Sequence, residues 1–268
     1  MIELPSDLEV LWIGNPLLDT AMPSLGDLRK LKELRVEYGR ELKCLLASFE
    51  LSSQLSWLKV AASPIIHTSE VFFDEVEYPN LKNLILEECI NVVEIGTLPK
   101  ALTCLTLHKC YNLRSIKGLC GLPMLRYLKI EECINVVEIG TLPKALRDVR
   151  LDRCYNLRSI QGLCGLPMLH WLEIEKCNEL QELPSVKTLV YLHVADCEKL
   201  KNIRDLAHLT QLFWLGVWGC PELEKLEGVE YCTSLMNFYV EGCHKLRFGE
   251  RVAERLHQKC DRRSFRLE

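Results

Sequence analysis

The sequence predicts an α/β solenoid, in which short coils of chain stack on one another around a parallel β-sheet. Three observations predict this fold. Leucines recur at fixed spacing along most of the 268 residues, eight cysteines lie 20 to 23 residues apart, and one stretch nearly repeats another. A period of roughly 20 to 50 residues indicates units that cannot bury their apolar faces alone and therefore stack.

Each repeat carries the pattern L-x-x-L-x-L-x-x-C or a variant of it, which is the signature of leucine-rich repeats. Eight copies end in a cysteine and three upstream copies do not, so we count eleven repeats. The upstream copies begin at Leu8, Leu31 and Leu55. The eight cysteines are Cys89, Cys110, Cys133, Cys154, Cys177, Cys197, Cys220 and Cys243.

Alternation with period two places the leucines of each repeat on one face of a short strand and the intervening residues on the other face. We therefore expect a leucine-rich-repeat horseshoe with a parallel concave β-sheet. The return halves, such as residues 112–119, are short and contain glycine. They predict turns and short 3-10 pieces on the convex side.

The recurring cysteine follows the strand, where the chain must turn inward. Cysteine is small, largely apolar and a weak S–H donor, so we interpret this position as structural. Metal ligation or redox chemistry is the alternative, but stacking places these thiols in a row of one per coil rather than in a cluster. Cys104 instead occupies an outward strand position, where exposure is expected.

The repeats and the C-terminal segment form separate parts of the chain. Residues 1–246 hold about eleven leucine-rich repeats, and residues 247–268 hold a predicted capping helix and a basic tail. The helix is predicted from apolar residues that recur every four positions, namely Phe248, Val252, Leu256 and Cys260. A solvated capping face explains the basic residues, and a nucleic-acid or membrane contact is the alternative.

Two irregularities concern the N-terminal half. Met1 leads almost directly into a repeat without a cap, so we expect the sequence to be part of a longer protein. Between Ile66 and Asn80 the repeat spacing stretches, through Val71-Phe72-Phe73, which an insertion or a degenerate return loop would explain.

The composition excludes several classes of function. With 33 basic against 37 acidic residues the formal charge is −4, so nucleic acid is not an expected partner. No apolar run approaches the roughly 18 residues of a membrane span, and the N-terminus does not resemble a signal peptide. The 14 cysteines include no C-x-x-C pair, and there is no N-x-S/T sequon. We expect a soluble protein of the reducing cytosol, with the nucleus as a second compartment.

A duplication shows where the sequence has changed. Residues 88–125 match residues 132–169 at 31 of 38 positions, and we expect five of the seven differences at outward strand positions. The exposed return loops are unchanged apart from Lys117/Gln161. This distribution favours diversification of a recognition face, with chance as the alternative. The differences are Thr103/Arg147, Cys104/Asp148, Leu105/Val149, Thr106/Arg150, His108/Asp152, Lys109/Arg153 and Lys117/Gln161.

Large aromatic residues also favour outward positions. They predict a ridge along the concave sheet from Tyr127 to Tyr239, interrupted at Asp148. Tryptophan and tyrosine are enriched at binding hot spots, and a soluble monomer normally avoids exposing large rings. The alternative is that Arg126, Lys129 and Lys176 cover the rings. The outward aromatic residues are Trp12, Trp57, Tyr127, Trp171, Tyr191, Trp214, Trp218 and Tyr239.

Charged residues flank this ridge, and such mixed charge sets partner choice and association rate more than affinity. Acidic residues share one strand position, at Glu87, Glu131, Asp152, Glu175 and Glu241, and a basic patch is expected at Arg126, Lys129, Arg147, Arg150 and Arg153. The candidate protein-binding residues of the concave face are Tyr127, Lys129, Arg147, Asp148, Arg150, Asp152, Trp171, Glu173, Tyr191, His193, Trp214, Trp218 and Tyr239.

Catalysis finds little support in the sequence. There is no G-x-x-x-x-G-K-[ST], G-x-G-x-x-G, H-E-x-x-H or G-x-S-x-G motif. The histidines, including His108, His170 and His193, are expected at exposed positions without a paired nucleophile. We expect a binding protein without catalytic residues, cofactor or metal.

The pattern C-x-x-L-x-x-I-x-G-L-x-x-L-P-x-L-x-x-L-x-I-x-x-C occurs at residues 110–133 and 154–177. It resembles the C-terminal leucine-rich repeats of plant nucleotide-binding disease-resistance proteins, particularly the Toll/interleukin-receptor-domain class, and the resemblance covers nearly the whole chain. It implies a cytoplasmic sensor of a pathogen effector or altered host protein, which restrains a nucleotide-binding switch. The switch and signalling domains are not in this sequence. The implied partner surface includes Tyr127, Arg147, Arg150, Trp171, Tyr191, Trp214 and Trp218.

Two other classes remain open. Substrate receptors of F-box-type ubiquitin ligases also place cysteine at this position, but their repeats are longer and continue differently from residues 112–116, Asn-Leu-Arg-Ser-Ile. An F-box ahead of the repeats would favour that class. A free-standing scaffold protein is the third class, and no residue excludes it.

Overall fold

The computed structural model describes residues 4–14, 28–37, 53–62, 70–71, 78–260 and 265–267, and only the backbone of residues 70–71 and 265–267. The chain consists of two compact units, Met1–Ile134 and Asn135–Glu268. Each unit carries its own run of repeats.

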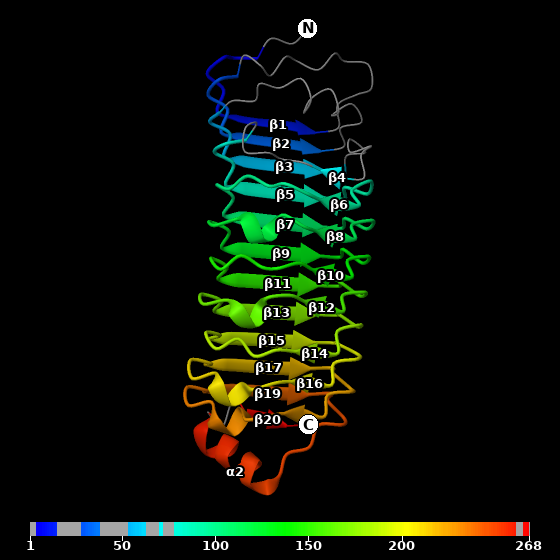
Figure 1. The fold of residues 1–268 in the computed structure, drawn as a ribbon, viewed down its shortest axis with the longest axis vertical. Coiled ribbons are helices and arrows are strands. Elements are labelled where there is room, and N and C mark those ends of the chain that lie inside the picture. The colour runs from blue at the N-terminus through cyan, green and yellow to red at the C-terminus, as the bar shows by residue number, and fades with distance from the viewer. Residues whose placement is uncertain are drawn as a thin grey trace. The chain divides into compact units, whose positions relative to one another are not determined.

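In the first unit the repeat strands form a parallel sheet in chain order (Figure 1). Neighbouring strands pair in register, so equivalent residues of successive repeats lie side by side; Leu84 pairs with Leu105, and Leu105 with Leu128. The strands are β1 (Val10–Gly14), β2 (Glu33–Glu37), β3 (Trp57–Ala61), β5 (Asn83–Glu87), β7 (Cys104–His108) and β9 (Tyr127–Glu131).

The second unit repeats this arrangement with parallel, in-register strands. Its last strand, β20 (Phe265–Leu267), follows the helix α2 (Glu250–Lys259) and pairs in parallel with β19. No sequence pattern in the basic tail predicts this strand. The other strands are β11 (Asp148–Asp152), β13 (Trp171–Glu175), β15 (Tyr191–Ala195), β17 (Trp214–Trp218) and β19 (Asn237–Glu241).

Alternation along each strand separates the core from the outward face, as the sequence predicts. In β13, Leu172 and Ile174 are fully buried, whereas Trp171, Glu173 and Glu175 are half-buried. The leucine positions of neighbouring coils stack into a continuous apolar core within each unit, which provides most of the favourable free energy of folding. The predicted parallel solenoid is confirmed.

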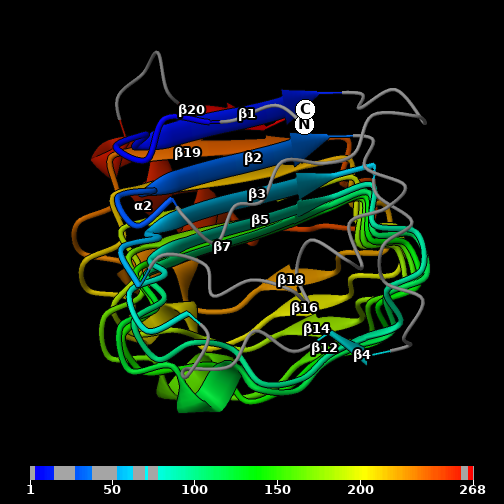
Figure 2. The ribbon, with the colours of Figure 1, turned by 90° about the horizontal axis from the view of Figure 1, so that it is seen from above.

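The return segments lie across the core from the main sheet. Figure 2 shows this for β12 (Ser159–Ile160), β14 (Glu182–Leu183), β16 (Asn202–Ile203) and β18 (Lys225–Leu226). The predicted 3-10 pieces are η1 (Leu119–Gly121), η2 (Leu163–Gly165), η3 (Leu206–His208) and η4 (Val229–Tyr231). The return segments also contain two-residue strands, which the sequence did not indicate and which pair in parallel with strands of neighbouring return segments. These strands are β4 (Glu70–Val71), β6 (Glu94–Ile95), β8 (Ser115–Ile116), β10 (Glu138–Ile139), β12 (Ser159–Ile160), β14 (Glu182–Leu183), β16 (Asn202–Ile203) and β18 (Lys225–Leu226).

A left-handed residue immediately before each repeat cysteine turns the chain inward. Lys176 and Asp196 have φ of 51° and 53°, and Gly219 and Gly242 take the same role in the last two copies. The turn brings the Cys177 thiol within 3.5 Å of the Glu175 carbonyl oxygen, to which it donates. The cysteine therefore combines apolar burial with a carbonyl contact, which supports its structural interpretation.

Thiol accessibility separates Cys120 and Cys164 from the buried cysteines, which include the repeat cysteines and Cys232 after η4. Cys120 and Cys164 are exposed, Cys104 is half-buried, and Cys177 is buried. A hydrogen bond with the Cys154 thiol, together with burial, raises the pKa of Cys177. Burial raises the pKa of Cys232 to about 12.

Because the thiolate is the reactive form, iodoacetamide at pH 8 should modify Cys120 and Cys164 in the folded protein. Cys177 and Cys232 should react only after denaturation, since they are buried and remain protonated. Peptide mass spectrometry of native and denatured samples measures both groups. Labelling of Cys177 at the rate of Cys164 in the folded protein would contradict the structural role.

Helix α2 lies at the C-terminal end of the second unit (Figure 1). Phe248 precedes the helix and Cys260 follows it, so the apolar stripe extends one residue or more beyond each end. Leu256 is fully buried, and the Lys259 ammonium donates to the Glu230 carbonyl oxygen at 2.6 Å. The helix therefore packs against η4. The stretch between Ile66 and Asn80, with Phe72 and Phe73, lies largely outside the described residues.

Candidate functional site: an aromatic face on the second unit

The candidate binding residues fall on the outward side of the strands. Tyr127 and Lys129 lie on β9 of the first unit. Eleven of the thirteen candidates belong to the second unit, where Arg147 immediately precedes β11 and ten lie on strands: Asp148, Arg150, Asp152, Trp171, Glu173, Tyr191, His193, Trp214, Trp218 and Tyr239. We call the outward side of β11 to β19 the aromatic face.

Three rings stack face to face along the aromatic face. Register places Trp171, Tyr191 and Trp214 side by side on β13, β15 and β17. The ring centroids of Trp171 and Tyr191 are 3.6 Å apart with an interplanar angle of 9°, and those of Tyr191 and Trp214 are 4.2 Å apart at 9°. The parallel, in-register strands therefore convert a repeat position into a continuous stack. Asp148 occupies this position on β11 and ends the series, as predicted.

A second group of rings surrounds Gly216. His193 and Tyr239 lie on either side of Gly216 in the register of β15, β17 and β19. Trp214 and Trp218, two residues away on either side along β17, are 5.4 Å apart between ring centroids. His193 is 4.8 Å from Trp218, and Tyr239 is 5.9 Å from Trp214. These four rings form what we call the Gly216 cluster.

Gly216 makes this arrangement possible, and the sequence did not indicate its role. A Cβ atom at residue 216 would lie 2.1 Å from Cη2 of Trp218 and 2.3 Å from Cη2 of Trp214. The two indoles therefore close over the glycine backbone, and Gly216 is buried although it occupies an outward position. The signal in the sequence was a glycine between two outward tryptophans in an otherwise unbroken strand.

We expect Gly216→Ala to displace the indoles of Trp214 and Trp218, because ring atoms occupy the space of the added methyl group. Overpacking of this kind typically costs about 1–3 kcal/mol of unfolding free energy. Near-UV circular dichroism should report the loss of ring packing, and denaturant titration the loss of stability. Ala195→Gly on β15 is the control, because it adds no atom to the cluster. An unchanged near-UV spectrum for Gly216→Ala would contradict this packing.

Arg150 borders the aromatic stack. Its guanidinium donates to both carboxylate oxygens of Asp148, at 3.0 and 3.1 Å, and lies 3.9 Å from a carboxylate oxygen of Glu173. Its central carbon is 5.2 Å from the ring centroid of Trp171. The Trp171 indole N–H in turn donates to Glu173 at 3.3 Å. The face thus holds a guanidinium with two carboxylates and one indole, which combines ion pairing with a cation–π contact.

These ion pairs change the expected basic patch. Arg150 pairs with Asp148, Arg153 pairs with Asp152 at 3.0 Å, and on the first unit Lys129 pairs with Glu131 at 2.6 Å. Three of the five residues of the expected patch are therefore paired with carboxylates. Arg150 is the one guanidinium at the outward strand positions of β11 to β19, and Arg153, which follows β11, pairs with Asp152 from outside the strand. These positions carry five carboxylates: Asp148, Asp152, Glu173, Glu175 and Glu241.

On the second unit the rings pack on one another, and Arg126, Lys129 and Lys176 were the residues considered as a cover. Lys176 pairs with Asp196 at 3.7 Å. Trp171, Tyr191, Trp214, Trp218 and Tyr239 are half-buried, and the contacts described above join them in one series. Burial is the main cause that raises the pKa of Tyr191, and the Glu173 carboxylate adds to it. The phenol is therefore a neutral hydrogen-bonding group at neutral pH.

Two of the histidines, His108 and His193, differ from the exposed positions expected for them. His170 is exposed, but His193 is only 17% exposed, and its Nε2 lies 2.9 Å from a carboxylate oxygen of Glu175. Ring neighbours cause this burial, since His193 stacks within the Gly216 cluster. His108 on β7 is also partly buried, at 24% exposure, beside Glu87.

The differences between the duplicated repeats gather in and beside the strands β7 and β11. Three of the seven differing pairs are outward strand positions: Cys104/Asp148, Thr106/Arg150 and His108/Asp152. The pairs at 103/147 and 109/153 immediately flank the strand and do not belong to it, which corrects the expected count of five. Only Leu105/Val149 is a core position.

The first unit contains a related arrangement that the sequence did not single out. The guanidinium carbon of Arg35 on β2 lies 4.3 Å from the ring centroid of Trp12 and 5.2 Å from that of Trp57. Glu33 accepts a hydrogen bond from the Trp12 indole at 3.4 Å. An arginine is therefore held against outward tryptophans on both units.

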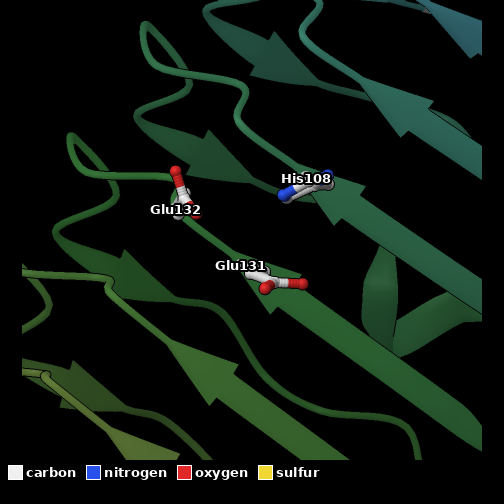
Figure 3. Close-up of side chains that lie close together, drawn as sticks. All are labelled: His108, Glu131 and Glu132. Carbon is white, nitrogen blue, oxygen red and sulfur yellow. The ribbon is translucent and has the colours of Figure 1, made fainter.

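One group of side chains could hold a metal ion. His108 at the end of β7, and Glu131 and Glu132 at the end of β9, each offer a ligand atom within 4.8 Å of the others (Figure 3). However, Glu131 is already ion-paired with Lys129, and His108 contacts Glu87 through Nδ1 at 3.2 Å. The group therefore resembles the other paired charges of the strand ends.

Comparisons with known proteins agree with the solenoid. No protein-family model matches the sequence, and no curated protein matches it significantly. The fold is similar to the leucine-rich-repeat domain of the type III effector XopL, with a TM-score of 0.52 and 18% identity, covering 87% of this chain and 76% of that one. An internalin, InlF, from Listeria monocytogenes matches with a TM-score of 0.38 and 15% identity over 84% of this chain and 76% of its own.

A leucine-rich-repeat protein from Bacteroides ovatus also matches, with a TM-score of 0.28 and 16% identity over 91% of this chain and 75% of its own. The repeat pattern, the parallel solenoid and the likeness to XopL together define the chain as a leucine-rich-repeat solenoid domain. Within the described part of the chain, no helix has the length and apolar character needed to cross a membrane.

Proposed function

We propose that this leucine-rich-repeat domain is a protein-binding module and that the aromatic face is its contact surface. The observation that carries the proposal is the series of five large rings at outward strand positions, Trp171, Tyr191, Trp214, Trp218 and Tyr239. Leucine-rich-repeat domains are typically non-catalytic binding modules that use an extended strand surface.

The ring contacts support a rigid surface. Stacked, half-buried rings lose little further conformational entropy when a partner covers them, so more of their contact energy remains as affinity. Tryptophan and tyrosine also present large apolar area with one polar group each. The paired charges of Arg150 and Asp148 at the border of the stack then provide orientation and discrimination.

The repeat consensus supports a proposal for the physiological role. We propose that the domain is the sensor part of a plant intracellular immune receptor, cytoplasmic or nuclear, which recognises a pathogen effector or a modified host protein. In the parent protein it would restrain a nucleotide-binding switch. The resemblance at residues 110–133 and 154–177 supports this role, as does the change of outward residues between the duplicated repeats.

The native transcript upstream of the Met1 codon tests this role. We expect an in-frame domain with a G-x-x-x-x-G-K-[ST] nucleotide-binding loop. An F-box in that place would contradict the receptor role and support a ubiquitin-ligase adaptor. An in-frame stop codon directly upstream would support a free-standing binding protein.

Selection of a displayed library of random peptides on the purified chain tests the binding surface. We expect selected peptides to lose affinity for Trp171→Ala, because this removes one end of the stack. Arg204→Ala on the return side, where Arg204 pairs with Glu182, should leave affinity unchanged. Peptides that depend on Arg204 and not on Trp171 would place the contact surface elsewhere.

A further inference from the structure

We propose that the aromatic face binds a basic segment of its partner and seats an arginine or lysine side chain beside Trp218. This inference rests on the proposed protein-binding function and names the chemistry of the partner. Its first support is charge, because the outward strand positions of β11 to β19 carry five carboxylates and one guanidinium.

The row of residues at the carboxyl ends of these strands defines the seat. Register places Glu175, Ala195, Trp218 and Glu241 next to one another on β13, β15, β17 and β19. Ala195 contributes only a methyl group to this row, and His193, two residues earlier on β15, contacts both the Glu175 carboxylate and the Trp218 ring. Among the described residues, no arginine or lysine lies over the rings of Trp214 or Trp218. This row therefore combines an indole with carboxylates on both sides.

The protein's own arginines show how such a seat holds a cation. Arg150 lies against Trp171 between the carboxylates of Asp148 and Glu173. Arg35 lies between Trp12 and Trp57 on the first unit. In both places an outward tryptophan accommodates a guanidinium, and at Trp171 the carboxylates of Asp148 and Glu173 hold it as well. The Trp218 row has the same components but holds no arginine or lysine among the described residues. His193 already contacts the Glu175 carboxylate through Nε2 at 2.9 Å and lies 4.8 Å from the Trp218 ring, so a partner's basic side chain would complete the row on the side of Trp218 and Glu241.

Tryptophan fluorescence titration with a synthetic peptide of alternating arginine and glycine tests this proposal. The same peptide with citrulline in place of arginine is the probe control, because citrulline keeps the shape and loses the charge. We expect the arginine peptide to bind at least about tenfold more tightly, and to bind more weakly as salt rises. Equal affinity for the two peptides would overturn the proposal.

Variants of the row test whether the arginine side chain of the peptide binds beside Trp218. Glu175→Gln and Glu241→Gln should each weaken binding of the arginine peptide several-fold, whereas Glu222→Gln on the return side, where Glu222 pairs with Lys245 at 2.7 Å, should not. Ala195→Arg should also weaken binding, because its guanidinium would occupy the seat from within the chain. Unchanged affinity in all three face variants would overturn the assignment to Trp218.

The library selection separates failure of this inference from failure of the proposed function. Selected peptides that are acidic or neutral, and that still require Trp171, would overturn the basic-segment inference and leave the protein-binding function in place. Selected peptides that require only return-side residues would overturn both.

Discussion

Phe238→Ala is expected to lower the unfolding free energy by about 3–5 kcal/mol, the usual cost of removing a fully buried phenylalanine side chain. Phe238 on β19 has no exposed surface and occupies a position that leucine fills in most repeats. Its ring meets Phe248 edge to face at 6.0 Å and therefore links the last coil to the segment before α2. The loss should be concentrated in the C-terminal coils, because repeats contact mainly their neighbours.

Denaturant titration measures the total loss, and hydrogen exchange of the β17 and β19 amides shows where it occurs. Tyr239→Ala provides the matched control on the adjacent, outward position. It removes ring contacts with Trp214 and Trp218 and should cost about 0.5–1.5 kcal/mol per lost contact. If Tyr239→Ala were the more destabilising change, the inward and outward assignments on β19 would be wrong.

Trp214→Ala is expected to weaken partner binding by about 1–4 kcal/mol, which corresponds to roughly 5- to 1,000-fold in Kd. Trp214 belongs both to the stack, through Tyr191, and to the Gly216 cluster, through Trp218 and Tyr239. Its loss removes the contact area at the centre of the aromatic face and loosens its neighbours. We expect Trp214→Ala to lower the unfolding free energy by less than Phe238→Ala does, because the Trp214 ring is half-buried and the underlying Leu215 remains in place.

The control for Trp214→Ala is Tyr231→Ala, since Tyr231 is an exposed aromatic residue of η4 on the return side of the same unit. Isothermal titration with a library-selected peptide gives both affinities, and thermal unfolding gives both stabilities. If Trp214→Ala bound the peptide more weakly only because much of the variant is unfolded, the ring would be structural and not a binding contact.

Most of the fold could be predicted because the same sequence pattern occurs in about eleven consecutive repeats. The leucine positions, the strand positions and the cysteine after each strand follow from one pattern, and the parallel register follows from stacking equal units. The two-residue return strands could not be predicted, because two residues carry no periodicity. The strand β20 was missed for a similar reason, since three residues beyond a basic helix give no repeat signal.

The candidate site could be predicted only in part. Outward tryptophans and tyrosines follow from alternation, but which rings touch depends on the register of neighbouring strands and on rotamers. Gly216 was missed because its importance lies in the space above its Cα atom, which Trp214 and Trp218 fill. The charges of Arg150 and Arg153 were identified, but their pairing with Asp148 and Asp152 was not, because ion pairs depend on side-chain geometry.

Oxidative footprinting of the tryptophans, with and without a selected peptide, tests the central claim most directly. We predict that the peptide protects Trp171, Trp214 and Trp218 from oxidation, because a partner on the aromatic face must cover them. Tyr231 and the other exposed aromatic residues of the return side should remain as reactive as in the free chain. Protection of the return side, with the three tryptophans unchanged, would contradict the assignment of the aromatic face as the binding surface.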